Sequence, residues 1–189
     1  GEELGMTNPH FSRITDYRDV ESLNMFAELR ASGREPDELL AILASKSRDN
    51  GRTPMQWDAS HNAGFTEGEP WIGVCDNYET VNARAALDDA DSVFYTYQSL
   101  IRLRKTLPML TWGDYEDLLP EHPSLWCYRR QWQGQTLMVV ANLSRERQQW
   151  QPDPVQGAWR VALGNYDDVP SRPNARLLRP FEAIWWVQE

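Results

Sequence analysis

The residue types most able to do chemistry stand close together in residues 47–58, with the sequence SRDNGRTPMQWD. Arg48 and Arg52 present planar, forked guanidinium groups that can hold carboxylates or the hydroxyls of a ligand. Trp57 adds a flat apolar surface with one N–H donor, a shape that suits the face of a sugar ring. An Asn-Gly pair and Pro54 predict a tight, non-helical bend. A rigid polar loop of this kind is typical of a binding site, although its chemistry alone fits an ordinary loop with an internal salt bridge equally well.

The same string resembles the Arg-Asp-Asn-x-Arg-Thr-Pro-Met-Gln-Trp signature of the oligo-1,6-glucosidase-like branch of glycoside hydrolase family 13, the α-amylase superfamily. Residues 1–8, 61–65, 68–72 and 92–95 resemble further segments of that family and stand in its order. The resemblance covers nearly the whole chain. It implies an α/β plus all-β fold, in which residues 1–111 are the C-terminal remnant of a (β/α)8 TIM barrel and residues 112–189 are a small antiparallel β-sandwich domain.

The apolar patterning predicts helices in the first part and strands in the second. Apolar residues at helical spacing indicate helices over residues 19–31, 36–46, 82–90 and 92–107. Asp16 or Asp19 is a candidate N-cap of the first helix, Pro36 suits the first turn of the second, and Leu39, Leu40, Ile42 and Leu43 would be its buried stripe. Alternation and β-forming residues predict a hairpin over residues 125–132 and 136–143, followed by strands near residues 148–151, 158–163, 175–179 and 181–187.

The reactive groups of a retaining glycosidase are two carboxyl groups about 5–5.5 Å apart. The chain has 28 acidic residues, so carboxylates by themselves identify no catalytic pair. The family's catalytic segments are not found in this sequence. The resemblance therefore implies that the catalytic residues lie upstream of Gly1, that the chain is a fragment cut on its N-terminal side, and that it is inactive alone.

The resemblance also implies roles for residues near the bend. Arg48 would bind substrate hydroxyls, and Glu21 matches a position near the leaving-group subsite. Asp49 and Arg52 would support them from behind. The structural alternatives are an Arg48–Asp49 or Arg48–Asp58 loop clamp and, for Glu21, a solvated helix face.

Four segments resemble the phosphotrehalases of this branch: residues 44–50, 110–115, 125–130 and 178–186. The activity implied is hydrolysis of α,α-trehalose 6-phosphate to glucose and glucose 6-phosphate with retention of configuration, so the partner would be a small sugar or sugar phosphate. Oligo-1,6-glucosidase or α-glucosidase activity is the alternative within the family. A phosphate site needs several donors; Lys46 and Arg13 are candidates that surface solubility explains equally well.

Composition narrows the other function classes. A net charge of −9 with scattered basic residues argues against nucleic acid, and no apolar run is long enough to span a membrane. Cys75 and Cys127 indicate reduced thiols and a cytoplasmic location. The three histidines show no metal spacing, so neither a metal nor a cofactor is expected. The full-length form is expected to be a monomer.

Nine tryptophans are many for this length. Core and sheet packing is the favoured reading of Trp126, Trp132, Trp150 and Trp159. The competing reading is a set of sugar-stacking platforms, which would make the chain a non-catalytic carbohydrate-binding module. A third possibility is a transporter-associated relative of the same superfamily with a membrane anchor upstream.

Overall fold

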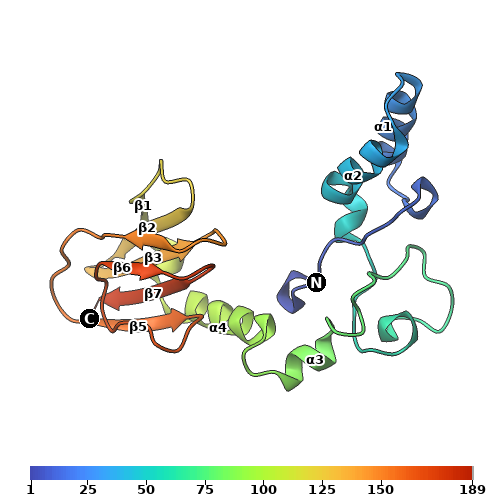
Figure 1. The fold of residues 1–189 in the computed structure, drawn as a ribbon. Coiled ribbons are helices and arrows are strands. Elements are labelled where there is room, and N and C mark those ends of the chain that lie inside the picture. The colour runs from blue at the N-terminus through green and yellow to red at the C-terminus, as the bar shows by residue number, and fades with distance from the viewer. Residues whose placement is uncertain (189) are drawn as a thin grey trace. The chain divides into compact units, whose positions relative to one another are not determined.

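The computed structural model describes residues 1–188 and divides into two compact units, the first being Gly1–Tyr97 and the second beginning at Gln98. Figure 1 shows the helices of the first unit and the sheets of the second. Among the described residues no helix is both long and apolar enough to cross a membrane. The first four α-helices are α1 (Val20–Ala31), α2 (Pro36–Lys46), the short α3 (Ala83–Asp88) and α4 (Val93–Thr106). Single 3-10 turns are η1 (Glu2–Leu4), η2 (Ile14–Asp16), η3 (Arg48–Gly51) and η4 (His61–Gly64).

Local signals account for the helix ends in the first unit. The side chain of Asp19 accepts a hydrogen bond from the Ser22 backbone and caps α1, while Pro36 occupies the first turn of α2. The four predicted helices are confirmed, because α1 to α4 lie within the predicted ranges. The predicted buried stripe of α2 is partly wrong, because only Leu39 and Leu43 are buried, whereas Leu40 and Ile42 keep part of their surface exposed.

The second unit begins its β-structure after the short helix α5 (Met109–Trp112). Five antiparallel strands form one sheet in the order β1-β2-β3-β7-β5, and two more form a second sheet, β4-β6. The strands are β1 (Asp114–Asp117), β2 (Leu125–Trp132), β3 (Gln135–Asn142), β4 (Gln148–Trp150), β5 (Trp159–Gly164), β6 (Arg176–Leu178) and β7 (Ala183–Gln188). The predicted hairpin and the four later strands are confirmed, and β1 and α5 were not predicted.

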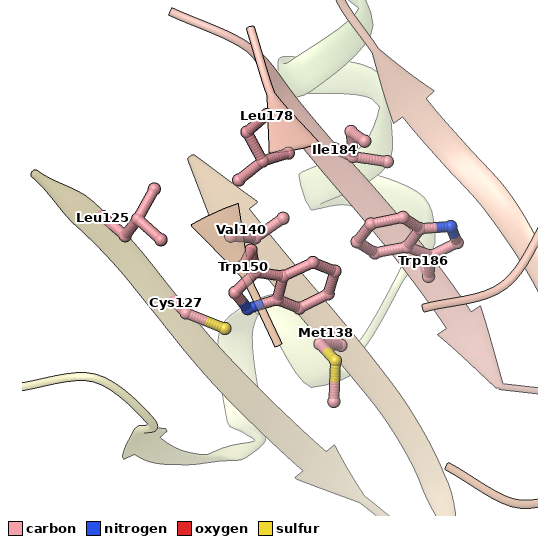
Figure 2. Close-up of a cluster of buried hydrophobic side chains, with 8 residues drawn as sticks. All are labelled: Leu125, Cys127, Met138, Val140, Trp150, Leu178, Ile184 and Trp186. Carbon is pink, nitrogen blue, oxygen red and sulfur yellow. The ribbon is translucent and has the colours of Figure 1, made fainter. Parts of the chain in front are cut away.

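Alternate residues of the large sheet face two apolar clusters. On one face, residues of β2, β3 and β7 pack against Trp150 of β4 and Leu178 of β6, as Figure 2 shows. The Trp150 and Trp186 rings stack with centroids 5.6 Å apart. On the other face, Leu137, Val139 and Val187 pack against Met109 of α5.

The tryptophans divide between packing and exposure. The packing reading is confirmed for Trp150, which is 2% exposed. Trp132 and Trp159 are half-buried. Trp126 packs on the sheet face and not in the core: it is 46% exposed, donates its indole N–H to the hydroxyl of Tyr115 at 3.2 Å and lies against the ring of Tyr128. Trp126 points away from the face that the small sheet covers, because its neighbours Leu125 and Cys127 point into that core.

Candidate functional site

The loop that follows α2 places its charged residues by a short chain of hydrogen bonds. Ser47 caps η3, with its hydroxyl accepting the N–H of Asp49 at 3.2 Å. The Ser47 hydroxyl also lies 2.9 Å from that of Ser22, which is in the first turn of α1. Both serines are buried. The start of α1 and the loop are therefore tied together at one point.

Asp49 is the buried anchor of this arrangement. Its side chain is fully buried, and Oδ2 accepts the backbone N–H groups of Arg18 at 2.7 Å and Asp19 at 2.8 Å. The guanidinium of Arg52 lies 3.8 Å from the other oxygen, Oδ1. A carboxylate that accepts backbone N–H groups just before a helix fixes where that helix begins. Asp49 and Arg52 thus lie together, as the prediction of supporting roles requires.

Asp19 links Arg52 to α1, a contact that the sequence reasoning missed. Arg52 donates to Asp19 Oδ1 at 3.2 Å, while Oδ2 accepts from the backbone and hydroxyl of Ser22 at 3.0 and 2.9 Å. Burial opposes the charge of Asp19, but the hydrogen bonds from Ser22 and Arg52 outweigh it and lower the pKa of this carboxyl. The spacing Asp-x-x-Ser was the available signal for the cap; no local pattern pointed to Arg52.

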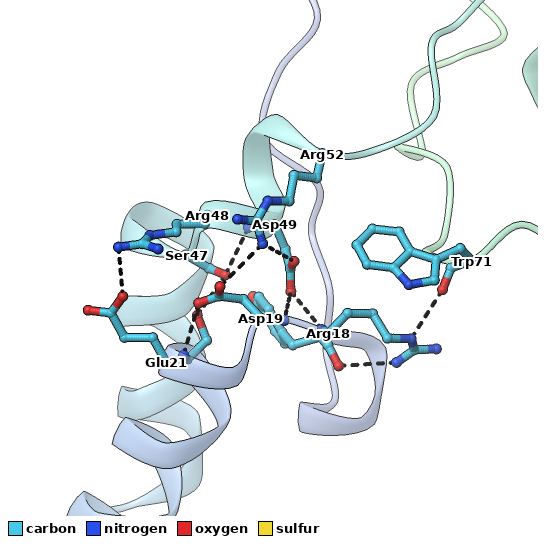
Figure 3. Close-up of polar contacts among 10 residues, drawn as sticks. Arg18, Asp19, Glu21, Ser47, Arg48, Asp49, Arg52 and Trp71 are labelled. Atoms are coloured by element: carbon cyan, nitrogen blue, oxygen red, sulfur yellow. Dashed lines mark hydrogen bonds and ion pairs between the residues drawn. The ribbon is translucent and has the colours of Figure 1, made fainter.

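The structure brings Arg48 and Glu21 together. Arg48 Nη2 lies 3.0 Å from Glu21 Oε2, and the two side chains are 66% and 72% exposed. Figure 3 shows the guanidinium turned towards this carboxylate, on the opposite side of the loop from Arg18 and Trp71. The predicted alternative of an Arg48 clamp onto Asp49 or Asp58 is wrong, because the partner of Arg48 is Glu21. Asp49 instead lies beside Arg52, and Asp58 accepts from Ser60.

Two cavities adjoin this loop. The smaller has a volume of about 180 Å³, and its lining includes both residues of the ion pair. The lining residues are Asp19, Glu21, Ser22, Met25, Leu43, Lys46, Ser47 and Arg48. The larger, of about 410 Å³, is lined by the first residues of the chain and by the bend, namely Gly1, Glu2, Met6, Thr7, Asn8, Asn50, Gly51, Thr53 and Met55. Lys46 therefore shares a cavity with Arg48. Arg13 instead pairs with Asp16 at 2.8 Å.

The chain after the bend is held in an unusual conformation. Asn62 and Ala63 have positive φ values of 52° and 58°, and Gly64 follows at 66°. The carbonyl of Ala63 accepts the N–H of Trp57 at 2.8 Å, which holds the turn at residues 62–64 against the loop of residues 47–58. Trp57 itself is 52% exposed. Non-glycine residues with positive φ persist where their surroundings hold them, and they cluster at ligand sites.

The arrangement offers a cation and a carboxylate at a cavity rim, which is suited to hydrogen bonding of hydroxyl groups and to charge neutralisation. The described residues contain no group of three or more histidine, cysteine or carboxylate side chains placed to hold a metal ion. The exposed guanidinium of Arg48 and the carboxylate of Glu21 therefore give this rim binding chemistry.

Comparisons with known proteins give the family. The α-amylase catalytic domain matches residues 1–113. The trehalose-6-phosphate hydrolase of Escherichia coli is 67% identical over 189 residues, which are 100% of this chain and 34% of that protein. An oligo-1,6-glucosidase of Heyndrickxia coagulans is 44% identical, over 100% of this chain and 33% of that protein.

A solved structure gives the same result. The crystal structure of Bacillus licheniformis trehalose-6-phosphate hydrolase superimposes with a TM-score of 0.92 at 43% identity, covering 99% of this chain and 34% of that chain. The chain thus spans about a third of the length of the relatives that it matches. The match of the catalytic domain to more than half of the residues is decisive, and the chain belongs to the α-amylase family.

Proposed function

We propose that this chain is part of a retaining glycoside hydrolase that cleaves α,α-trehalose 6-phosphate to glucose and glucose 6-phosphate. The observation that carries the proposal is the 67% identity to the E. coli trehalose-6-phosphate hydrolase, which extends over all 189 residues. In this proposal residues 1–111 complete a (β/α)8 barrel, and residues 112–189 form a β-sandwich. The nucleophilic and acid/base carboxylates belong to the two thirds of the enzyme that these residues do not span.

Arg48 and Glu21 are the proposed substrate contacts. Their ion pair is largely exposed and borders a cavity, so both groups can exchange this contact for sugar hydroxyls. Asp49 and Arg52 support these two residues by holding the loop against the start of α1. The position of Lys46 at the same cavity supports a role for this rim in meeting an anionic substrate group.

The compartment, partner and oligomeric state of the enzyme are also part of this proposal. Two free, buried cysteines support a reducing, cytoplasmic compartment. A small sugar phosphate is the proposed partner, and the complete enzyme is proposed to act as a monomer without a cofactor.

The second candidate function is that of an oligo-1,6-glucosidase, and the 44% identity to the H. coagulans enzyme supports it. One experiment separates the two. The complete enzyme is assayed with trehalose 6-phosphate and with isomaltose, and kcat/KM is compared. A preference for trehalose 6-phosphate of at least tenfold supports the first function, a preference for isomaltose supports the second, and no hydrolysis of either overturns both.

A further inference from the structure

A cavity of about 360 Å³ lies in the second unit, between the five-stranded sheet and the segment 151–156. Its floor is apolar. Cys127, Met138 and Trp150 line it and are 2%, 6% and 2% exposed. Figure 2 shows the three side chains converging from β2, β3 and β4. The polar side chains of the lining include Gln131, Thr136, Gln151, Asp153, Gln156 and Gln188.

The wall formed by segment 151–156 is fixed by hydrogen bonds. The carbonyl of Gln156 accepts both the indole N–H of Trp159 at 2.8 Å and the amide of Gln188 at 3.1 Å. The carbonyl of Val155 accepts from Arg172 at 2.7 Å. Two prolines further restrict the segment. The cavity is therefore preformed, which lowers the entropic cost of binding a ligand.

The glycine after this wall allows its close approach to the sheet. Gly157 has a φ of 77°, and a Cβ atom there would lie 2.8 Å from the side-chain nitrogen of Gln188. A larger residue would strain the backbone and push Gln188 away from the Gln156 carbonyl. The shape of the cavity thus depends on a specific backbone conformation rather than on loose packing.

The charges at the cavity argue against an anionic ligand. The lining carries Arg129, Glu116 and Asp153, and the Arg129 guanidinium donates to Glu116 at 3.0 Å. The carboxylate of Asp153 then leaves the rim with a net negative charge. Burial raises the pKa of the Cys127 thiol to about 12, so this floor group is neutral at physiological pH.

The lining therefore combines an apolar floor with amide groups that both donate and accept hydrogen bonds. Such a combination matches a neutral ligand with an apolar face and many hydroxyl groups. We propose that this cavity of the β-structured unit binds a neutral mono- or disaccharide. The volume, at the lower end of the usual range for ligand sites, limits the occupant to one or two sugar rings.

The test uses D-glucose and trehalose as probes of the complete protein labelled with 5-fluorotryptophan. The 19F resonance of Trp159, assigned by its loss in Trp159→Phe, reports on this cavity because Trp159 lines it. Gln131→Phe introduces a ring at the cavity wall. Gln135→Phe is the matched control, because Gln135 is exposed on the same hairpin and pairs with Trp132 outside the lining.

We expect either sugar to shift the Trp159 resonance saturably, with a dissociation constant in the millimolar range, as is usual for weak sites. The shift should weaken at least tenfold in Gln131→Phe and persist in Gln135→Phe. Inorganic phosphate at the same concentration should leave the resonance in place. The proposal is overturned if neither sugar shifts it, if Gln131→Phe responds like the control, or if phosphate alone shifts it. Turnover is not measured, so this result is independent of the hydrolysis assay.

Discussion

Arg48 Nη2 and Glu21 Oε2 lie 3.0 Å apart, joining the loop after α2 to the first turn of α1. An exposed ion pair of this kind contributes little to stability. Because the pair lies at a cavity rim, we expect its two side chains to bind substrate rather than to stabilise the fold. Variants of Arg48 and Glu21 distinguish these two roles.

In the proposed complete enzyme, Arg48→Ala should lower kcat/KM by about one to three orders of magnitude, because a contact that positions the substrate is lost. The matched control is Arg34→Ala, which removes another exposed arginine that pairs with a glutamate, Glu38. The control should retain the kinetics of the wild type. Equal kinetics in Arg48→Ala and the wild type would remove Arg48 from the binding site.

Exchanging the charges tests what the pair itself does. The double variant Glu21→Arg with Arg48→Glu can restore an ion pair but places each charge on the wrong side of the cavity. If both residues contact substrate, the kcat/KM of the double variant should stay as low as that of the less active single variant. Recovery to the level of the wild type would mean that the pair acts only by holding α1 against the loop.

Asp49→Ala should destabilise the chain by about 3 kcal/mol, because the buried N–H groups of Arg18 and Asp19 lose their acceptor. Asp37→Ala, at an exposed position in the first turn of α2, should cost less than about 1 kcal/mol. Urea unfolding of the complete enzyme measures both. Similar midpoints for the two variants would show that Asp49 does not anchor the loop.

The parts of the fold that were predictable are those with local signals. Asp19 and Pro36 mark helix starts by their own chemistry. The sequence of β2 alternates, whereas β3 is a continuous apolar run that is buried on both faces of the sheet. Strand β1 escaped prediction because its sequence, Asp-Tyr-Glu-Asp, carries no apolar alternation. It exists as an edge strand through its pairing with β2, as in Glu116 opposite Arg129.

In the candidate site, too, residues close together in the sequence could be predicted, and contacts between distant residues could not. The loop motif identified Arg48, Asp49 and Arg52, since all three stand in one short string. The contact of Arg52 with Asp19 joins distant parts of the sequence, and no periodicity or spacing encodes it. Such pairings follow from how α1 and α2 meet, which only the three-dimensional arrangement provides.

The turn between β2 and β3 offers a stabilising change. Gln133 and Gly134 have φ values of 48° and 81°, the combination of a two-residue hairpin turn that favours Asn-Gly. Gln133→Asn should raise the unfolding free energy by about 0.5 kcal/mol. Gly134→Ala should lower it by about 1 kcal/mol through backbone strain alone, because a Cβ atom there meets no neighbour within 4 Å. Thermal melting of both variants is the measurement, and a lower melting temperature in Gln133→Asn would contradict this view of the turn.

Glu182 is the buried charge of the second unit. Its side chain is fully buried and lies 2.8 Å from Arg176 and 3.0 Å from Arg179. Glu182→Gln leaves two arginines without their shared carboxylate and should cost about 3 kcal/mol. Glu116→Gln removes the partner of Arg129 at a half-exposed pair and should cost at most about 1 kcal/mol. Equal losses in urea unfolding would contradict the special role of the buried group.

The difference between the wild type and Glu182→Gln should also depend on pH. Burial raises the pKa of Glu182, but hydrogen bonds from Arg179 and the charges of Arg176 and Arg179 outweigh it, so its pKa lies below the ordinary value of 4.5. A lowered carboxyl pKa stabilises the folded state fully above that ordinary value, and this contribution is lost as pH falls through the folded pKa. The gap in unfolding free energy should therefore be constant from pH 7 to about pH 5 and should narrow as the pH falls below 4.5 towards the lowered pKa of folded Glu182, since a protonated Glu182 resembles glutamine. Urea midpoints across this range measure the gap. A gap that stays constant or widens on acidification would mean that Glu182 is not held ionised by its arginines.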